Sequence, residues 1–127
     1  KVGLGTDVGG GTSLSMLQTM NEAYKVTQMR QQKLSPLQAF FLATLGGAKA
    51  LCLEDKIGNF DVGKEADFIV INPRSTPLMA LRNSEEVPNT LEELSERLFT
   101  LVIMGDDRAI QSTYIMGELA YEKSLIC

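Results

Sequence analysis

The sequence predicts an α/β fold that joins the last strand and the following helices of a β/α barrel to a small separate sheet. One short apolar run, at residues 2–6, leads directly into two amphipathic helical patterns, and a third such pattern lies at residues 90–105. The remaining strand patterns come late, at residues 67–73 and 110–121. So few strands cannot cover three amphipathic helices, and we therefore expect further strands in a longer chain.

The first half of the chain is predicted to form a strand and two helices. Residues 2–6 form the buried strand, and a glycine-rich turn joins it to a helix over residues 12–31. The apolar face of this helix is set by residues at helical spacing, namely Leu14, Leu17, Met20 and Tyr24. A second helix begins at Ser35, because Ser35 and Gln38 form a capping-box pattern and Pro36 suits the first helical position.

Two glycines lie inside the second helical pattern, at Gly46 and Gly47. Two glycines cost a helix about 2 kcal/mol relative to alanine, so they predict a break near Thr44 or the close approach of another backbone. The apolar stripe of this helix consists of Leu37, Phe40, Phe41 and Leu45. Because the chain offers the two helices few strands to pack on, we expect the isolated chain to oligomerise or aggregate.

The second half is predicted to be richer in strands and loops. Residues 67–73 are predicted to form a strand closed by Pro73, and its four consecutive apolar residues suggest burial on both faces. A loop follows over residues 74–89, with one helical turn at residues 78–82. A capping box of Thr90 and Glu93 begins the third helix, which ends near Gly105. Residues 110–116 and 118–121 then form a hairpin around Gly117.

Charged residues near these elements have structural interpretations. Lys64 and Asp67 are predicted to fix the turn into the strand that follows them. Asp106, Asp107 and Arg108 are predicted to form a solvated turn, with contact to a substrate pocket or a second subunit as the alternative.

Composition and charge exclude several classes of protein. The 127 residues are 44% hydrophobic and 22% charged, as in folded globular chains, and the net charge is −4 with no basic patch to bind nucleic acid. The longest nearly apolar run, residues 98–104, is too short to span a membrane. Cys52 and Cys127 have no metal or disulfide spacing, so we interpret both as free thiols in the reducing cytoplasm.

The start of the chain lacks an initiator methionine and a leader-like segment. It enters an apolar run at once, so we expect Lys1 to mark a cut inside a larger chain. Removal of a leader or a tag is the alternative.

The glycines after the first strand do not match the known phosphate-binding motifs. A P-loop would require lysine where Gly11 stands, and a dinucleotide fingerprint would require its third glycine where Val8 stands. Both patterns therefore fail at a residue that carries their chemistry.

Asp7 is the remaining candidate at this turn. Active sites of β/α barrels lie at the carboxyl ends of the strands, and Asp7 directly follows the predicted strand. A carboxylate there can bind a metal ion and accept a proton from water. The glycines at positions 9, 10 and 11 would let backbone and substrate come close. The alternative is that Asp7 only stabilises the turn or caps the following helix.

Four stretches carry a resemblance to a known family. They are GTDVGGG at residues 5–11, ATLGGA at 43–48, IGNFDVGKEAD at 57–67 and MGDDR at 104–108. Together they resemble the C-terminal part of the guanine deaminases, a family within the metal-dependent amidohydrolase superfamily. The glycine–lysine–aspartate element is shared across that superfamily, whereas the opening stretch points to the guanine deaminases.

The resemblance implies a fold and a domain division. The family fold is a distorted (β/α)8 barrel with a small β-sandwich built from both chain ends. Residues 1–56 would then be the C-terminal end of the catalytic barrel. Residues 57–127 would be the C-terminal contribution to the β-sandwich, with an intervening loop and helix at residues 74–105.

The resemblance also implies a zinc-dependent hydrolase that converts guanine to xanthine and ammonia. In that family, histidines of earlier strands and one aspartate after the last barrel strand hold the metal. That aspartate matches Asp7, which would be both a metal ligand and the catalytic proton shuttle. Gly9, Gly10 and Gly11 would bind the substrate. We expect a cytoplasmic homo-oligomer with guanine as its small-molecule substrate and with no nucleic-acid or membrane partner.

The chain departs from this pattern in having no histidine. Catalytic zinc sites need about three protein ligands, so the chain alone is predicted to be inactive and to retain no zinc. Two alternatives stay open. The chain is part of another amidohydrolase, such as a cytosine- or triazine-type deaminase, or it is a non-catalytic α/β module that serves binding or assembly.

Overall fold

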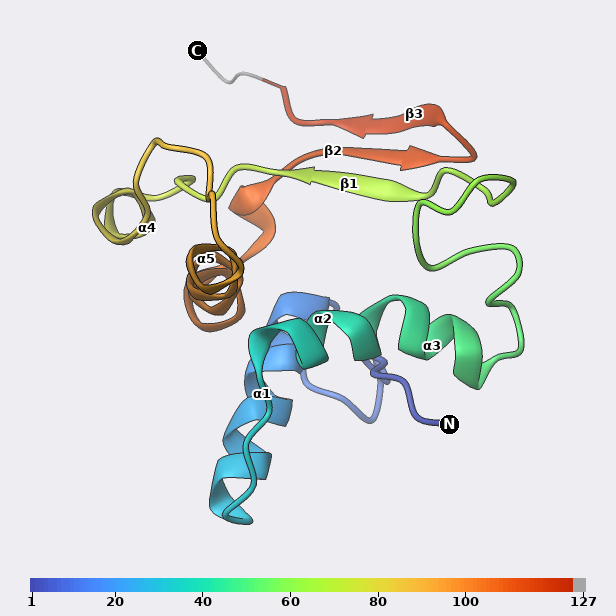
Figure 1. Cartoon of the computed structure of the whole chain (residues 1–127), viewed down its shortest axis with the longest axis horizontal. Helices are drawn as coiled ribbons and strands as arrows, with labels where there is room; N and C mark the ends of the chain where they lie inside the picture. The colour runs from blue at the N-terminus through green and yellow to red at the C-terminus, as the bar shows by residue number, and fades with distance from the viewer. Residues whose placement is uncertain (125–127) are drawn as a thin grey trace.

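The computed structural model describes residues 1–124 and places an antiparallel sheet on one side of a group of helices (Figure 1). Cys127 lies outside the described residues. Helix α5 lies between the sheet and the helices of the first half, and it contacts α1, α2 and α4. The elements in chain order are α1 (Met16–Met29), α2 (Pro36–Ala43), α3 (Leu45–Ala50), β1 (Phe68–Ile71), α4 (Pro77–Arg82), α5 (Leu91–Met104), the 3-10 turn η1 (Asp107–Ala109), β2 (Ile110–Ile115) and β3 (Glu118–Glu122).

The helix starts follow the capping signals of the sequence. Ser35 and Gln38 form the predicted capping box of α2, and Thr90 and Glu93 form that of α5. Helix α1 begins later than predicted, because the side chain of Ser15 accepts the hydrogen bond that caps it. Leu14 therefore precedes the helix and is 78% exposed, so it is not part of the apolar face predicted for it.

Both predictions for Gly46 and Gly47 are confirmed. The helical pattern breaks at Thr44, whose φ of −126° and ψ of −102° separate α2 from α3. A Cβ atom added at Gly3 would lie 2.6 Å from the Cα of Gly47, so two backbones meet where a side chain would not fit. This contact holds the beginning of the chain against α3.

The strand predicted at residues 2–6 is not formed within this chain. The backbone N–H of Leu4 donates to the carbonyl of Leu42 at 2.9 Å, so the segment bonds to the end of a helix instead of to a neighbouring strand. An apolar run becomes a strand only where a partner strand supplies a ladder of hydrogen bonds, and the described chain supplies none here.

The three strands form one antiparallel sheet in the order β1-β2-β3. Phe68 lies opposite Tyr114, and their rings stack with centroids 4.5 Å apart. The predicted hairpin is confirmed: Met116 and Gly117, with φ of 52° and 82°, make the two-residue turn between β2 and β3. Positive φ at both central residues is typical of the turn that matches strand twist.

Asp67 holds this hairpin turn. Its Oδ1 atom accepts a hydrogen bond from the backbone N–H of Met116 at 2.8 Å, and the carbonyl of Ala66 accepts one from Gly117 at 3.0 Å. Lys64 lies 3.5 Å from Asp61, within its own turn. Lys64 therefore matches its predicted local role, whereas Asp67 fixes a turn 49 residues away.

We expect Asp67→Ala to destabilise the hairpin by about 1 kcal/mol, because the bond is exposed and a typical hydrogen bond has that net value. Urea unfolding measures the change in the free energy of unfolding. Glu65→Ala is the matched control, since Glu65 is an exposed neighbour whose side chain makes no hydrogen bond within residues 1–124. Equal stability of the two variants would show that the carboxylate of Asp67 does not hold the turn.

The core lies where α1, α2, α4 and α5 meet. Its buried residues are Leu17, Met20, Ala39, Met79, Leu101, Val102 and Ala109. Tyr24 of α1 meets Phe99 of α5 edge to face, with ring centroids 5.2 Å apart. The expectation that the faces of α1 and α2 lack partners is therefore wrong in part: Leu17 and Met20 are buried against α5, whereas Leu37 and Phe41 of α2 stay 36% and 43% exposed.

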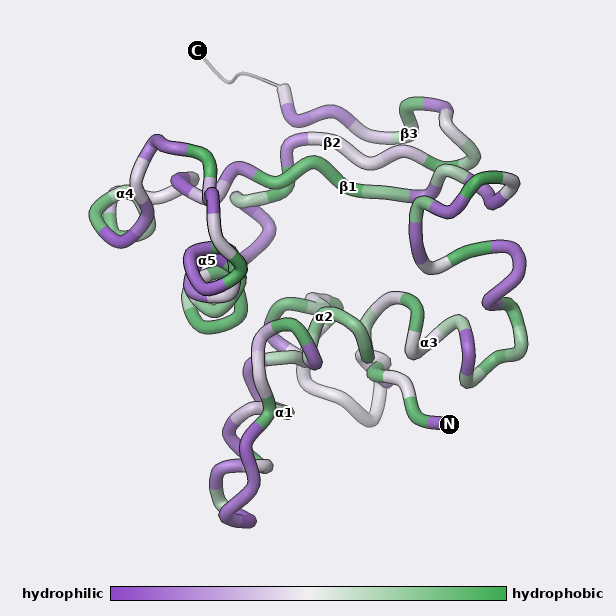
Figure 2. The backbone as a smooth tube through the Cα atoms, viewed as in Figure 1, coloured by the Kyte–Doolittle hydropathy of each residue, from purple (hydrophilic) through white to green (hydrophobic). Residues whose placement is uncertain are grey.

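Strand β1 is apolar along its length (Figure 2), but it is not buried on both faces as its sequence suggests. Ile69 and Val70 are 48% and 43% exposed. β1 is an edge strand, and no second sheet layer covers it within residues 1–124. None of the helices described is long and apolar enough to cross a membrane.

Candidate functional site

Asp7 begins a tight turn that leads towards α1. Its φ of 47° lies in the left-handed region, which aspartate tolerates better than most residues. Its carbonyl oxygen accepts hydrogen bonds from the backbone N–H groups of Gly10, at 3.0 Å, and of Gly11. The main chain thus folds back on Asp7, and its side chain is exposed.

The carboxylate of Asp7 lies over the Cα atom of Gly10. A Cβ atom added at Gly10 would be 2.8 Å from Oδ2 and 3.4 Å from Cγ of Asp7. A Cβ atom added at Gly11 would be 2.0 Å from the carbonyl oxygen of Thr6. The glycines predicted together as substrate-binding residues therefore have different local reasons to be glycine.

No residue within 1–124 donates a hydrogen bond to the Asp7 carboxylate. Its oxygen lone pairs are therefore available to a ligand or a proton. The two ends of the turn are held: Leu4 bonds to Leu42, and Ser13 Oγ accepts from the backbone N–H of Ser15 at 2.9 Å. The arrangement is a carboxylate with unused lone pairs on an anchored turn.

The described residues do not complete a metal site. No group of three or more histidine, cysteine, aspartate or glutamate side chains comes together within residues 1–124. A catalytic zinc ion needs about three protein ligands, and Asp7 supplies one carboxylate. The chain by itself does not fit a bound zinc ion.

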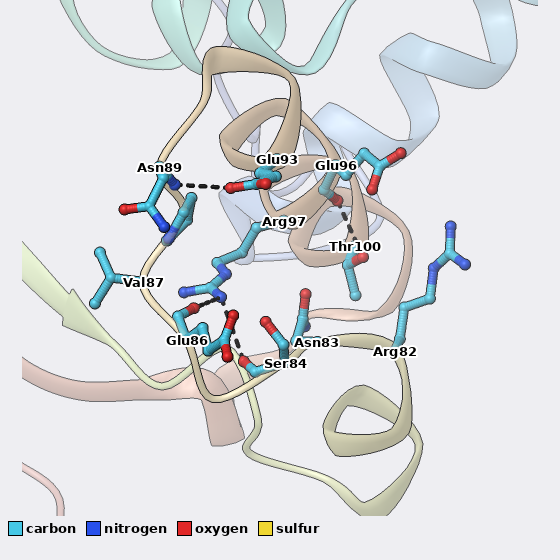
Figure 3. Close-up of a pocket in the computed structure, with 11 residues that line it drawn as sticks. Arg82, Asn83, Ser84, Glu86, Val87, Asn89, Glu93, Glu96, Arg97 and Thr100 are labelled. Atoms are coloured by element: carbon cyan, nitrogen blue, oxygen red, sulfur yellow. Dashed lines mark hydrogen bonds between the residues drawn. The ribbon is translucent and has the colours of Figure 1, made fainter.

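A pocket of about 310 Å³ lies far from Asp7 in sequence, between α5 and the loop after α4 (Figure 3). Two of its charged side chains, those of Arg97 and Glu93, form hydrogen bonds to backbone groups of the loop before α5. Arg97 donates to the carbonyl oxygens of Ser84, at 3.3 Å, and Glu86, at 2.5 Å, and Glu93 accepts from the backbone N–H of Asn89 at 2.7 Å. These contacts hold the loop in place; the predicted capping box indicated that of Glu93, whereas no sequence pattern indicated those of Arg97.

The segment from Asp106 to Arg108 forms the predicted solvated turn. Nη2 of Arg108 lies 2.6 Å from Oδ2 of Asp106, and both side chains are substantially exposed. The hydrogen bonds from the Arg108 guanidinium hold the pKa of Asp106 below its usual value. Asp106 also caps η1 by accepting from the backbone N–H of Arg108, so both charges serve the turn.

The chain matches one family along nearly its whole length. The profile described as "Amidohydrolase family" matches residues 1–120. Guanine deaminase of Escherichia coli (strain K12) is 54% identical over 124 residues, covering 98% of this chain and 27% of the relative. Guanine deaminase of Mus musculus is 40% identical over 125 residues, with 93% and 27% covered.

A solved structure shows the same similarity in three dimensions. The structure titled "E. coli Guanine Deaminase" superposes with a TM-score of 0.89 at 54% identity, over 98% of this chain and 28% of that chain. The present chain therefore spans about a quarter of the length of the curated relatives it matches.

Proposed function

The chain belongs to the amidohydrolase family, and we propose on this basis that it is the C-terminal part of an enzyme that hydrolyses guanine to xanthine and ammonia. The observation that carries the proposal is the similarity to guanine deaminases in sequence and in structure over almost the whole chain. The exposed Asp7 carboxylate on its anchored turn supports it, because hydrolytic deamination needs a group that accepts and returns a proton.

In the proposed reaction, water adds to C2 of guanine and the C2 amino group leaves as ammonia, so C2 becomes the carbonyl of xanthine. Asp7 accepts a proton from the attacking water and passes it to the departing amine. The carboxylate occupies the space left by the missing side chain of Gly10, and no hydrogen bond within residues 1–124 ties it to its own chain.

We also propose that Asp7 is one ligand of a zinc ion in the longer protein. The ion, when bound, would lower the pKa of a water molecule. The other ligands would be residues outside this chain, since it contains no histidine and its described residues form no metal-binding cluster. The carboxylate fits the role of a single ligand because its oxygens accept no hydrogen bond within residues 1–124.

The proposal extends to the domain division. Residues 1–56 would close the catalytic barrel, where a neighbouring strand would pair with residues 2–6. Residues 57–127 would contribute β1, β2 and β3 to the small β-sandwich, with the loop and helices of residues 74–105 packed beside them. The exposed apolar residues of β1 support a covering layer from elsewhere in the protein. A cytoplasmic homo-oligomer remains part of this proposal.

The test is ammonia release from guanine by the longer protein that contains this chain, together with its zinc content. We expect turnover of guanine and about one zinc ion per chain. The isolated 127-residue chain is the comparison, and we expect it to show neither turnover nor retained zinc because it offers one ligand. Turnover by the isolated chain would refute the division of the site. If the longer protein acts on cytosine or a triazine but not on guanine, the result would favour another amidohydrolase. If it acts on none of these compounds, the result would favour a non-catalytic module.

A further inference from the structure

We infer that Gly10 is a positioning residue for the Asp7 carboxylate. Its missing side chain leaves the space that the carboxylate occupies, and this sets the direction in which the carboxylate oxygens point. The effect that we expect on catalysis rests on the proposed function, whereas the contact between Gly10 and the Asp7 carboxylate is a property of this chain.

The Asp7 carboxylate lies close to the position that a side chain of residue 10 would occupy. A Cβ atom at Gly10 would lie 2.8 Å from Oδ2, 3.4 Å from Cγ and 3.7 Å from Oδ1 of Asp7, and outside Gly10 and its two chain neighbours these are the three nearest heavy atoms. A separation below 3.0 Å forces something to move. Here the atom that must move belongs to the carboxylate.

Backbone conformation does not by itself require glycine at position 10. Gly10 is absent from the residues with positive φ, so an L-residue can adopt its conformation. Gly9 does have a positive φ, of 114°, and Gly11 abuts the carbonyl oxygen of Thr6, which cannot rotate away. Only Gly10 among these three glycines is constrained chiefly by the Asp7 side chain.

Alanine at position 10 would therefore turn the Asp7 side chain while leaving the backbone in place. No donor within residues 1–124 holds the carboxylate where it is, so rotation about its side-chain bonds relieves the clash. A small displacement of a reacting group matters, since a misplacement of about 1 Å can reduce a rate about 10²-fold.

The test compares Gly10→Ala with Gly5→Ala in the longer protein. Gly5 is the matched control, because a Cβ atom there meets nothing within 4 Å among residues 1–124 and its φ is not positive. We expect Gly10→Ala to lower kcat for guanine about 10- to 100-fold with little change in KM, and to lose zinc faster to a chelator. We expect Gly5→Ala to resemble wild type in both, and both variants to melt near the wild-type temperature.

A double-mutant cycle separates action through Asp7 from general damage. If Gly10 acts through the carboxylate, then Gly10→Ala should change the residual rate of the Asp7→Asn variant less than twofold. An equal fold-loss in both backgrounds would overturn the inference. A raised KM with unchanged kcat would also overturn it, because Gly10 would then line the substrate pocket instead of positioning Asp7.

A crystal structure of the Gly10→Ala protein tests the contact without any assay of activity. We expect the Asp7 carboxylate to be displaced while the backbone of residues 7–11 stays in place. An unmoved carboxylate would refute the inference even if the enzyme deaminates guanine. Failure of the wild-type protein to deaminate guanine would refute the proposed function. The position of the Asp7 carboxylate in the Gly10→Ala crystal structure would then decide the inference on Gly10.

Discussion

Asp7→Asn in the longer protein is expected to reduce kcat for guanine by about 10²–10⁴-fold, the usual contribution of a general acid–base group. Asparagine keeps the size of the side chain but cannot accept the proton. It also tolerates the left-handed backbone found at Asp7, with φ of 47°, so the turn should remain intact. Asp7→Ala should lose at least as much activity, with an added strain of about 1 kcal/mol from the same backbone conformation.

The measurements on each variant are its steady-state kinetics with guanine, its zinc content and its thermal melting. Asp55→Asn is the matched control, because Asp55 is an exposed aspartate of the same chain whose side chain makes no hydrogen bond within the described residues. We expect it to keep wild-type kcat. Should Asp7→Asn retain more than about a tenth of wild-type kcat, well above the range for a lost acid–base group, then Asp7 is a residue of the turn only.

The sequence predicted those features of the fold that depend on neighbours along the chain. Both capping boxes formed because their partners are three residues apart, as Ser35 and Gln38 show. The turn at Gly117 formed because its backbone requirement is local. The break at Thr44 was predicted from the two adjacent glycines, although the structure places both of them inside α3.

Features that depend on distant partners could not be predicted in this way. The run at residues 2–6 has the composition of a strand, yet Leu4 bonds to Leu42 because no strand within residues 1–124 lies beside it. Burial of β1 was inferred from four apolar residues, but its exposure is set by which layers surround it. Asp67 reaches across 49 residues to Met116, and no spacing rule signals such a contact.

The candidate site likewise has one residue that the sequence could identify and one whose role it could not. Asp7 could be selected from its place after an apolar run and before glycines, and the structure shows its carboxylate exposed with unused lone pairs. The particular role of Gly10 could not be predicted, because it depends on where the folded turn places the Asp7 carboxylate. Three consecutive glycines look alike in sequence and differ once the turn is formed.

The isolated 127-residue chain is expected to associate or to aggregate. Its accessible surface is 8978 Å², about a third more than the ~6,700 Å² typical of a monomeric protein of this mass. This surface includes large apolar side chains that are each more than 70% exposed, among them Leu14, Met29, Phe60, Leu81 and Val87. Burying one such side chain fully contributes about 1.5–3 kcal/mol, so the chain gains strongly by covering several of them.

The surfaces expected to meet differ in part from those predicted from helical spacing. Leu17 and Met20 are already buried, so the contact should involve Phe41 of α2 and the exposed residues of the sheet, such as Ile69 and Tyr121. A stable protein–protein interface buries about 1,200–2,000 Å² in total, which is within the excess surface of two such chains.

Light scattering over a dilution series, with binding of a hydrophobic dye, measures the association. A monodisperse monomer at micromolar concentration, with a cooperative melt and little dye binding, would contradict this expectation. It would also favour the non-catalytic module over the part of an enzyme, because the chain would then close its own core.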